Sequence, residues 1–207
     1  MPSISESESA HPDLERLRRR FAGGTAPHDT LYGDQGARPD VHELRPASVL
    51  VPIVARSPQP TVLFTRRTAH LKTHSGQISF PGGRAEPADP SPEHTALRET
   101  EEEIGLPAAH IELLGRLSDY HTRTGYRITP VVGLVRPPFE LRPDDNEVAE
   151  VFEVPLMFLL DARNHQRHYR EFEGHRRGYF AIPYDDYYIW GATAGMLINL
   201  HRFLGTG

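Results

Sequence analysis

Short apolar runs alternate with turn-forming segments through the middle of the chain. Residues 47–54 and 61–65 are two such runs, rich in β-branched side chains, and the segment 57–60 between them holds two prolines. This arrangement predicts a strand, a turn and a second strand. Apolar runs of similar length predict further strands at residues 111–117, 128–135, 148–154 and 178–183.

Helical spacing is clearest in residues 92–104. Ser91 is a favourable N-cap, Pro92 suits the first helical position, and Gly105 is a typical residue at a helix end. A helical turn is expected at residues 156–160. Residues 192–204 predict a closing helix with four inward-facing side chains, Met196, Leu197, Leu200 and Leu204.

The N-terminal part of the chain has a different character. Residues 1–11 are rich in serine and glutamate and are expected to be disordered. Residues 13–21 predict a short helix that docks through one apolar stripe, and residues 23–46 predict a loop-rich connection. The stripe consists of Leu14, Leu17 and Phe21.

We therefore expect an N-terminal extension over residues 1–46 and a single domain over residues 47–204. Strands and helices follow one another irregularly in this domain, which predicts an α/β fold with a mixed sheet. A chain of 207 residues is long enough to bury a core without disulfides or metal staples.

Composition narrows the classes of function mainly by exclusion. The chain has no cysteine, which excludes disulfides, thiolate zinc sites, cysteine nucleophiles and iron–sulfur clusters. Its formal net charge of −5 disfavours general nucleic-acid binding, because phosphate neutralisation needs a basic surface. No apolar run approaches the roughly 18 residues of a membrane helix, and the N-terminus lacks the apolar core of a secretory signal. We expect a cytoplasmic protein without a membrane or nucleic-acid partner.

Three glutamates share one side of the predicted helix at residues 92–104. On a wheel of about 100° per residue, Glu99, Glu102 and Glu103 fall within about 100° of arc. Like charges at these spacings repel, and the helix dipole disfavours anions in the last turn. A divalent cation would relieve both effects, since Mg²⁺ and Mn²⁺ prefer carboxylate oxygens. The alternative is a solvated acidic face, partly balanced by an Arg98–Glu102 pair.

The residues on either side of this helix favour a metal site over a solvated acidic face. Upstream, Gly82 and Gly83 follow a proline and mark a turn with unusual backbone angles or a close approach. Together with residues 98–106 (RETEEEIGL), this turn resembles the Nudix box, G-x5-E-x7-R-E-U-x-E-E-x-G-U, where U is aliphatic. Thr100 occupies an aliphatic slot, and the first acidic slot holds Asp89, with one extra residue before the arginine. The resemblance therefore leaves the role of this aspartate open.

A second motif narrows the resemblance to a Nudix subgroup that acts on coenzyme A. Its signature is roughly L-L-T-x-R-S-x3-R-x3-G-x3-F-P-G-G, and residues 63–83 keep this spacing throughout. Arg67 fills the first arginine slot, Lys72 replaces the second arginine, and Phe64 and Thr68 are further substitutions. The resemblance covers roughly residues 47–204 and implies the Nudix α/β/α sandwich with a mixed β-sheet.

This resemblance implies metal-dependent hydrolysis of the pyrophosphate bond of coenzyme A or acyl-CoA. The products would be 3′,5′-ADP and (acyl-)4′-phosphopantetheine, and the cofactor would be Mg²⁺ or Mn²⁺. The metal candidates are Glu99, Glu102 and Glu103, with Glu102 also expected to be catalytic. The candidate general base is Glu147, in the acidic segment 144–150, for which a charged turn is the alternative.

The same signature supplies the candidate substrate contacts. These are three basic residues and the double glycine: Arg66, Arg67, Lys72, Gly82 and Gly83. Arg67 is the first candidate for reading the 3′-phosphate of coenzyme A, whereas a solvated strand edge is the alternative for all three basic residues. Aromatic residues at 184–190 are expected to pack in a core or interface, with stacking on adenine as the alternative.

The box alone also fits a Nudix hydrolase of ADP-ribose, dinucleotides or nucleotide sugars. A third hypothesis is a Nudix-fold binding module without catalysis, which predicts loss of the metal carboxylates, and all three are present. The expected partner is a small-molecule substrate. Nudix relatives are often dimers, so a homodimer is an open expectation.

Overall fold

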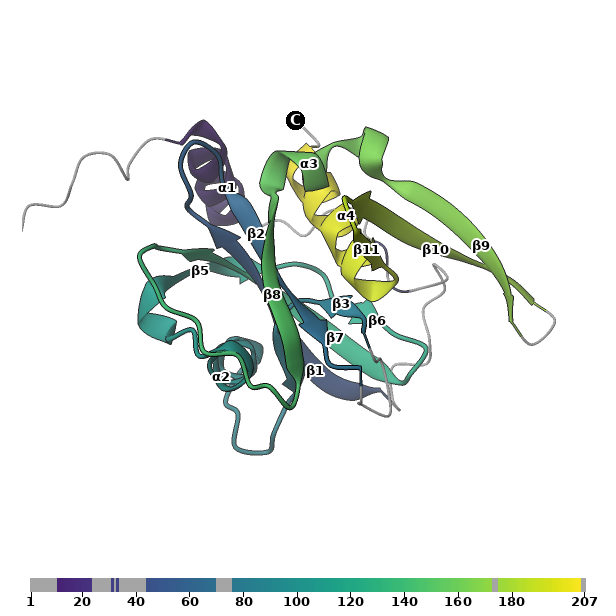
Figure 1. Ribbon diagram of the computed structural model, residues 1–207, viewed down its shortest axis with the longest axis horizontal. Helices are drawn as coiled ribbons and strands as arrows, with labels where there is room; N and C mark the ends of the chain where they lie inside the picture. Colours follow the sequence, from purple (N-terminus) through teal and green to yellow (C-terminus); the bar gives the residue numbers. More distant parts are fainter. Residues whose placement is uncertain are drawn as a thin grey trace, which may run out of the picture.

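The computed structural model describes residues 11–23, 31, 33, 44–69, 76–172 and 175–205 (Figure 1). The helices are α1 Pro12–Ala22, α2 Pro92–Ile104, η3 Ala108–His110, α3 Leu156–Leu160, η4 Ala162–Asn164 and α4 Ala192–Gly205. The strands are β1 Arg45–Val54, β2 Thr61–Arg67, β3 Ile78–Ser79, β4 Gly82–Arg84, β5 Ile111–Arg116, β6 Tyr120–His121, β7 Tyr126–Val135, β8 Val148–Pro155, β9 Gln166–Phe172, β10 His175–Tyr184 and β11 Tyr187–Trp190.

Eight of the described strands form one mixed sheet, as the sequence predicts. Its main path runs β3-β2-β1-β7-β5, and β4, β6 and β8 pair with β1, β7 and β2. Strands β1 and β7 run parallel from Arg45↔Tyr126 to Val54↔Val135, whereas β1 pairs antiparallel with β2 and β4. Strands β11, β10 and β9 form a separate three-stranded antiparallel sheet.

Helices cover both faces of the large sheet, which gives the expected α/β/α sandwich. Along β1, Val49, Val51 and Ile53 join the main core cluster, which also holds residues of α1, α3 and α4. Leu50 packs on the other face in a cluster with Ala96 of α2. Figure 1 shows α2 and α4 on opposite sides of the strands. Burial on both faces explains why residues 47–54 are continuously apolar instead of alternating.

Helix α1 packs into the same core instead of standing apart. Leu14 and Leu17 are buried, as the stripe predicts. Two of its arginines bind the C-terminal end of α4: Arg16 donates to the carbonyl of Leu204 at 2.7 Å, and Arg20 donates to that of Phe203 at 2.6 Å. The division into an extension at 1–46 and a domain at 47–204 stays a prediction, and most of residues 1–11 and 23–46 lie outside the described residues.

The predicted helices and the longer strands of the large sheet are confirmed to within a few residues. The short strands β3, β4 and β6 and the outer strands β9 and β11 were not predicted, and β10 is longer than expected. Strand β9 is exposed along most of its length, so its sequence lacks the apolar alternation that marks a half-buried strand. None of the described helices combines the length and apolarity needed to cross a bilayer.

Candidate active site

Helix α2 begins and ends at the residues that the sequence predicts. The Ser91 hydroxyl accepts a hydrogen bond from the backbone N–H of His94, and Pro92 occupies the first turn. Gly105 ends the helix in the left-handed conformation, with φ of 67°. A glycine adopts this conformation without the steric cost of a Cβ, so the helix stops directly after its glutamates.

Strand β4 approaches α2 closely because it starts with two glycines. A Cβ at Gly83 would overlap the carboxylate of Glu99, and a Cβ at Gly82 would overlap the backbone of β1. The backbone N–H of Gly82 donates to Oε2 of Glu103 at 3.3 Å. The double glycine therefore allows the carboxylates of α2 to lie against the strand.

Glu103 is the buried member of the glutamate cluster, with only 6% of its surface exposed. Burial raises the pKa of its carboxyl to about 8, and the negative charges of Glu147 and Glu99 act in the same direction. The Arg67 guanidinium and the Gly82 N–H oppose this rise only in part. A cation at this position would supply the positive charge that favours the ionised form.

The other two glutamates have different surroundings. Burial is the main cause of a raised pKa at Glu99, and the charges of Glu102 and Glu147 add to it, while Arg98 lowers it. Glu102 is 60% exposed and lies 2.8 Å from Nη1 of Arg98. The helical wheel correctly placed the three carboxylates on one side of α2, but they differ strongly in burial.

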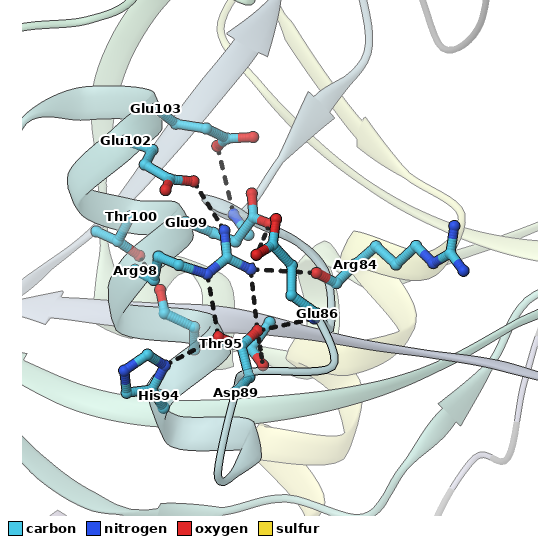
Figure 2. A network of polar contacts seen from close by, with 12 residues as sticks. Arg84, Glu86, Asp89, His94, Thr95, Arg98, Glu99, Thr100, Glu102 and Glu103 are labelled. Carbon is cyan, nitrogen blue, oxygen red and sulfur yellow. Dashed lines mark hydrogen bonds and ion pairs between the residues drawn. The ribbon is translucent and has the colours of Figure 1, made fainter.

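Asp89 holds the arginine that contacts two of these glutamates (Figure 2). Its side chain is 3% exposed and accepts hydrogen bonds from Nε and Nη2 of Arg98 at 3.2 and 3.0 Å. The hydroxyl of Thr95 and the backbone N–H of Glu86 also donate to it. These contacts, Arg98 first, keep the pKa of Asp89 well below its usual range. The acid of the shifted Nudix-box position is therefore tied to Arg98, which in turn contacts Glu99 and Glu102.

Asp89→Asn is expected to weaken the apparent affinity for the activating metal by about 10- to 100-fold, because partners behind metal ligands fix the orientation of those ligands. The measurement is a titration of activity with Mg²⁺ or Mn²⁺. Glu101→Gln is the matched control, since it removes one exposed carboxylate from α2 and leaves Asp89 and Arg98 in place. An unchanged metal dependence in Asp89→Asn would show that Arg98 keeps its position without this anchor.

Arg67 lies between the buried glutamate and the candidate base. Its Nη1 is 3.7 Å from Glu103 Oε1, and its Nη2 is 3.6 Å from Glu147 Oε2. This location puts the guanidinium beside the glutamate cluster. Glu147 is 48% exposed at this site.

The segment that carries Glu147 is joined to the end of α2 by its main chain. The backbone N–H of Asp144 donates to the carbonyl of Glu103 at 2.9 Å, and that of Arg142 donates to the carbonyl of Ile104 at 2.8 Å. A tight turn follows, in which the N–H of Glu147 donates to the carbonyl of Asp144. Residues far apart in sequence thus meet at one end of the helix.

Arg66, the other basic candidate among the described residues, is not at the glutamate cluster. Arg66 forms an ion pair with Glu150 at 2.6 Å, and its side chain leaves β2 on the face opposite to Arg67. Its role in substrate binding stays a prediction. Lys72 lies outside the described residues.

A cavity of about 430 Å³ opens beside the glutamate cluster. Arg67, Gly82 and Gly83 belong to its wall, so three of the five predicted substrate contacts lie where the cluster and the cavity meet. Most of the remaining wall is apolar or neutral and comes from β1, β3, β7 and the start of α4. The wall also includes Ala47, Arg84, Thr124, Tyr126 and Trp190.

The donor set fits a hard divalent cation. In the described part of the chain, no three acidic or histidine side chains already surround a common point. However, Glu99 and Glu103 turn toward the β4 glycines, and Gly83 keeps open the space that a Cβ would take from Glu99. Their raised pKa values and mutual repulsion are the conditions that a bound Mg²⁺ or Mn²⁺ would relieve.

Comparison with known proteins decides the family. The model of the NUDIX domain matches residues 44–173 of the chain. This protein belongs to the Nudix family. Two relatives, each named "Uncharacterized Nudix hydrolase NudL", come from Yersinia pestis (strain Pestoides F) and Yersinia pseudotuberculosis serotype O:1b (strain IP 31758). Each is 42% identical over 160 residues, which covers 75% of this chain and 78% of the relative.

Among solved structures, a Nudix hydrolase from M. smegmatis, RenU, is 24% identical to this chain. The match covers 56% of this chain and 74% of that one, with a TM-score of 0.47. Membership of the Nudix family and the NudL relatives support hydrolase activity, and Nudix hydrolases generally use divalent metal ions.

The sequence analysis did not identify Arg84, or the residues of β1 and β7 that line the cavity, as candidate site residues. Arg84 follows the double glycine directly, yet a lone arginine has no spacing that distinguishes it from a solvated one. For Trp190 the sequence favours packing, with stacking on adenine as the alternative. Its ring packs on that of Tyr179, with the centroids 5.6 Å apart, and the residue also lines the cavity. The pairing of β4 with β1 places Arg84 at the cavity, whereas Trp190 reaches it from the separate sheet of β9, β10 and β11.

Proposed function

We propose that this protein hydrolyses the pyrophosphate bond of coenzyme A or acyl-CoA, with Mg²⁺ or Mn²⁺ as the cofactor. The observation that carries the proposal is the position of the coenzyme A-type signature. Its Arg67, Gly82 and Gly83 stand between the glutamates of α2 and a cavity large enough to take part of a nucleotide. A plain Nudix box would account for Gly83 and the glutamates but not for Arg67.

In the proposed reaction, the oxygen of a water molecule attacks one phosphorus of the pyrophosphate. The bond from that phosphorus to the bridging oxygen breaks, and the products are 3′,5′-ADP and (acyl-)4′-phosphopantetheine. Glu147 accepts a proton from the attacking water. Glu99, Glu102 and Glu103 would hold the cation, which neutralises negative charge that develops on the phosphate oxygens. Arg67 adds a positive charge beside the same oxygens.

The roles of the other candidates follow from their positions. Gly83 gives the substrate access to the glutamates, because a side chain there would fill the space between β4 and α2. Gly82 allows β4 to approach the backbone of β1, and its N–H donates to Glu103. Arg66 and Lys72 remain proposed substrate contacts on the strength of the signature. Asp89 and Arg98 act by positioning Glu99 and Glu102 and do not contact the substrate in this proposal.

A substrate panel with product identification by mass tests the proposal. Coenzyme A, an acyl-CoA, ADP-ribose, a dinucleotide and a nucleotide sugar are each incubated with the protein and Mg²⁺ or Mn²⁺. We expect kcat/KM for coenzyme A to exceed that for ADP-ribose by about tenfold or more, as one additional charge-assisted phosphate contact would give. Excess chelator should abolish the activity, and the rate should rise toward alkaline pH.

Two results would contradict the proposal. Faster cleavage of ADP-ribose than of coenzyme A would favour the broader Nudix activity on nucleoside diphosphate derivatives. Full activity in excess chelator would rule out the metal-dependent reaction. A Glu103→Gln preparation, purified in parallel, controls for contaminating hydrolases.

A further inference from the structure

The wall of the cavity is positively charged although the chain as a whole is acidic. Among its described lining residues, the charged side chains are Arg67 and Arg84, and no carboxylate is present. Arg67 already lies within 3.7 Å of Glu103 and Glu147. The charge of Arg84 is therefore the part of this wall that the glutamate cluster does not balance.

Arg84 extends away from the metal candidates. Its backbone carbonyl accepts a hydrogen bond from Nη2 of Arg98 at 3.2 Å, which fixes the main chain on the glutamate side. Figure 2 shows its side chain running in the opposite direction, away from Glu99 and Glu103. No hydrogen bond or ion pair joins its guanidinium to another described residue. An anion that contacts Arg84 would thus lie on the cavity side of β4, apart from the pyrophosphate at the glutamates.

A second arginine, Arg45, lies on the neighbouring strand β1, on the same face of the sheet as Arg84. Arg84 pairs with Ala47 of β1, which lines the cavity, and Arg45 lies two residues before Ala47. Side chains two residues apart on a strand point to the same side, and diagonal partners on adjacent strands are within reach of long side chains. Arg45 therefore stands at the cavity rim, on the same face of the sheet as Arg84.

The contacts of Arg45 confirm this position and leave its charge unbalanced. Its guanidinium carbon lies 4.1 Å from the ring centroid of Tyr126, and its Nη2 donates to the carbonyl of Thr124 at 2.9 Å. Both partners line the cavity and both are neutral. Within the described ranges, Arg45 has no carboxylate partner. The hydroxyl of Thr124 adds a further hydrogen-bonding group at this side of the cavity.

We propose that Arg84 and Arg45 form an anion-binding subsite for a phosphate group of the substrate other than the pyrophosphate that is cleaved. Two guanidinium groups offer planar, charge-assisted hydrogen bonds that suit a phosphate dianion. A ligand that filled the cavity would strip water from both groups, so a bound anion there compensates the lost solvation. The identity of the anion as the 3′-phosphate of the nucleotide half rests on the proposed function.

Calorimetric binding of two nucleotides tests the subsite without any turnover. Adenosine 3′,5′-bisphosphate and adenosine 5′-monophosphate differ only in the 3′-phosphate, and both are titrated into protein kept in chelator. Each charge-assisted contact is worth roughly 10- to 150-fold in affinity. We therefore expect wild-type protein to prefer the bisphosphate by at least about tenfold, and Arg84→Gln and Arg45→Gln each to remove most of this preference.

Arg127→Gln is the matched control. Arg127 is adjacent to Tyr126 on β7, so its side chain leaves the opposite face of the strand, where it lies 3.8 Å from Asp119. This variant should keep the full preference for the bisphosphate. Arg84→Lys retains the charge without the planar fork and should keep part of it. Melting temperatures of all variants show whether each protein is folded.

The outcomes separate the subsite from the proposed function. Equal binding of the two nucleotides by wild-type protein, or a preference that survives in the Arg84→Gln/Arg45→Gln double variant, would overturn the subsite. Hydrolysis of coenzyme A is measured on the same preparations. Hydrolysis without a preference for the bisphosphate contradicts the subsite alone, whereas the preference without hydrolysis supports the subsite and contradicts the proposed reaction.

Discussion

Glu103→Gln is expected to lower kcat by at least about 10³-fold, because a lost metal ligand removes charge stabilisation in the transition state. Glu102→Gln should have an effect of the same order. Steady-state kinetics at saturating Mg²⁺ or Mn²⁺ measure the loss. Glu101→Gln is the matched control, since it removes a carboxylate from the same turn of α2 but on an exposed side. Turnover near the wild-type rate in either variant would remove that residue from the metal site.

The same Glu103→Gln variant should be more stable than the wild type in the absence of metal. The pKa of Glu103 is about 8 in the folded protein and lies near 4.5 when the chain is unfolded. The folded state thus binds more protons between these values, so wild-type stability falls as the pH rises from about 4.5 to 8. Glutamine does not titrate and avoids this loss.

Thermal melting in chelator measures the difference. Each pKa unit corresponds to about 1.4 kcal/mol, and one kcal/mol shifts Tm by roughly 2–4 °C in a protein of this size. We expect Glu103→Gln to melt at least about 3 °C above wild type at pH 8.5, with a much smaller gain at pH 5. A gain that is independent of pH would show that burial does not penalise the ionised carboxylate.

Removal of the candidate base should have the second large effect. Glu147→Gln is expected to lower kcat by about 10²- to 10⁴-fold, the usual contribution of a positioned general base. KM should change much less than kcat, because the base acts on the attacking water and does not hold the substrate. Asp145→Asn, in the same exposed turn, should leave kcat unchanged. Unchanged turnover in Glu147→Gln would assign proton transfer to another group.

Local signals account for the parts of the fold that sequence reasoning predicted. The cap at Ser91 and the stop at Gly105 lie next to the helix that they bound, so α2 could be placed without knowledge of the rest of the chain. The apolar run of β1 was equally clear, because both of its faces are buried. Strand β9 carries no such signal, since its side chains are mostly in solvent.

The candidate site was predictable in its residue types but not in its electrostatics. A helical wheel places Glu99, Glu102 and Glu103 together, yet the burial of Glu103 depends on the approach of β4. Strand alternation separates Arg66 from Arg67 but does not tell which of them faces the glutamates. The contact between Asp89 and Arg98 requires a loop conformation that the spacing of the motif does not specify.

Main-chain hydrogen bonds from Asp144 and Arg142 to the end of α2 hold the loop that leads to Glu147. Because N–H and carbonyl groups form these bonds, the exposed side chains of Arg142, Pro143 and Asp145 can vary without breaking them. Asp144 is different, since its Oδ1 accepts the backbone N–H of Asn146 and so holds the turn before Glu147. The outer surface of this segment can therefore change while Glu147, the proposed proton acceptor, keeps its position beside the glutamates of α2. An exchange of loop residues between Nudix proteins would disturb Glu147 least if it replaced only these exposed side chains.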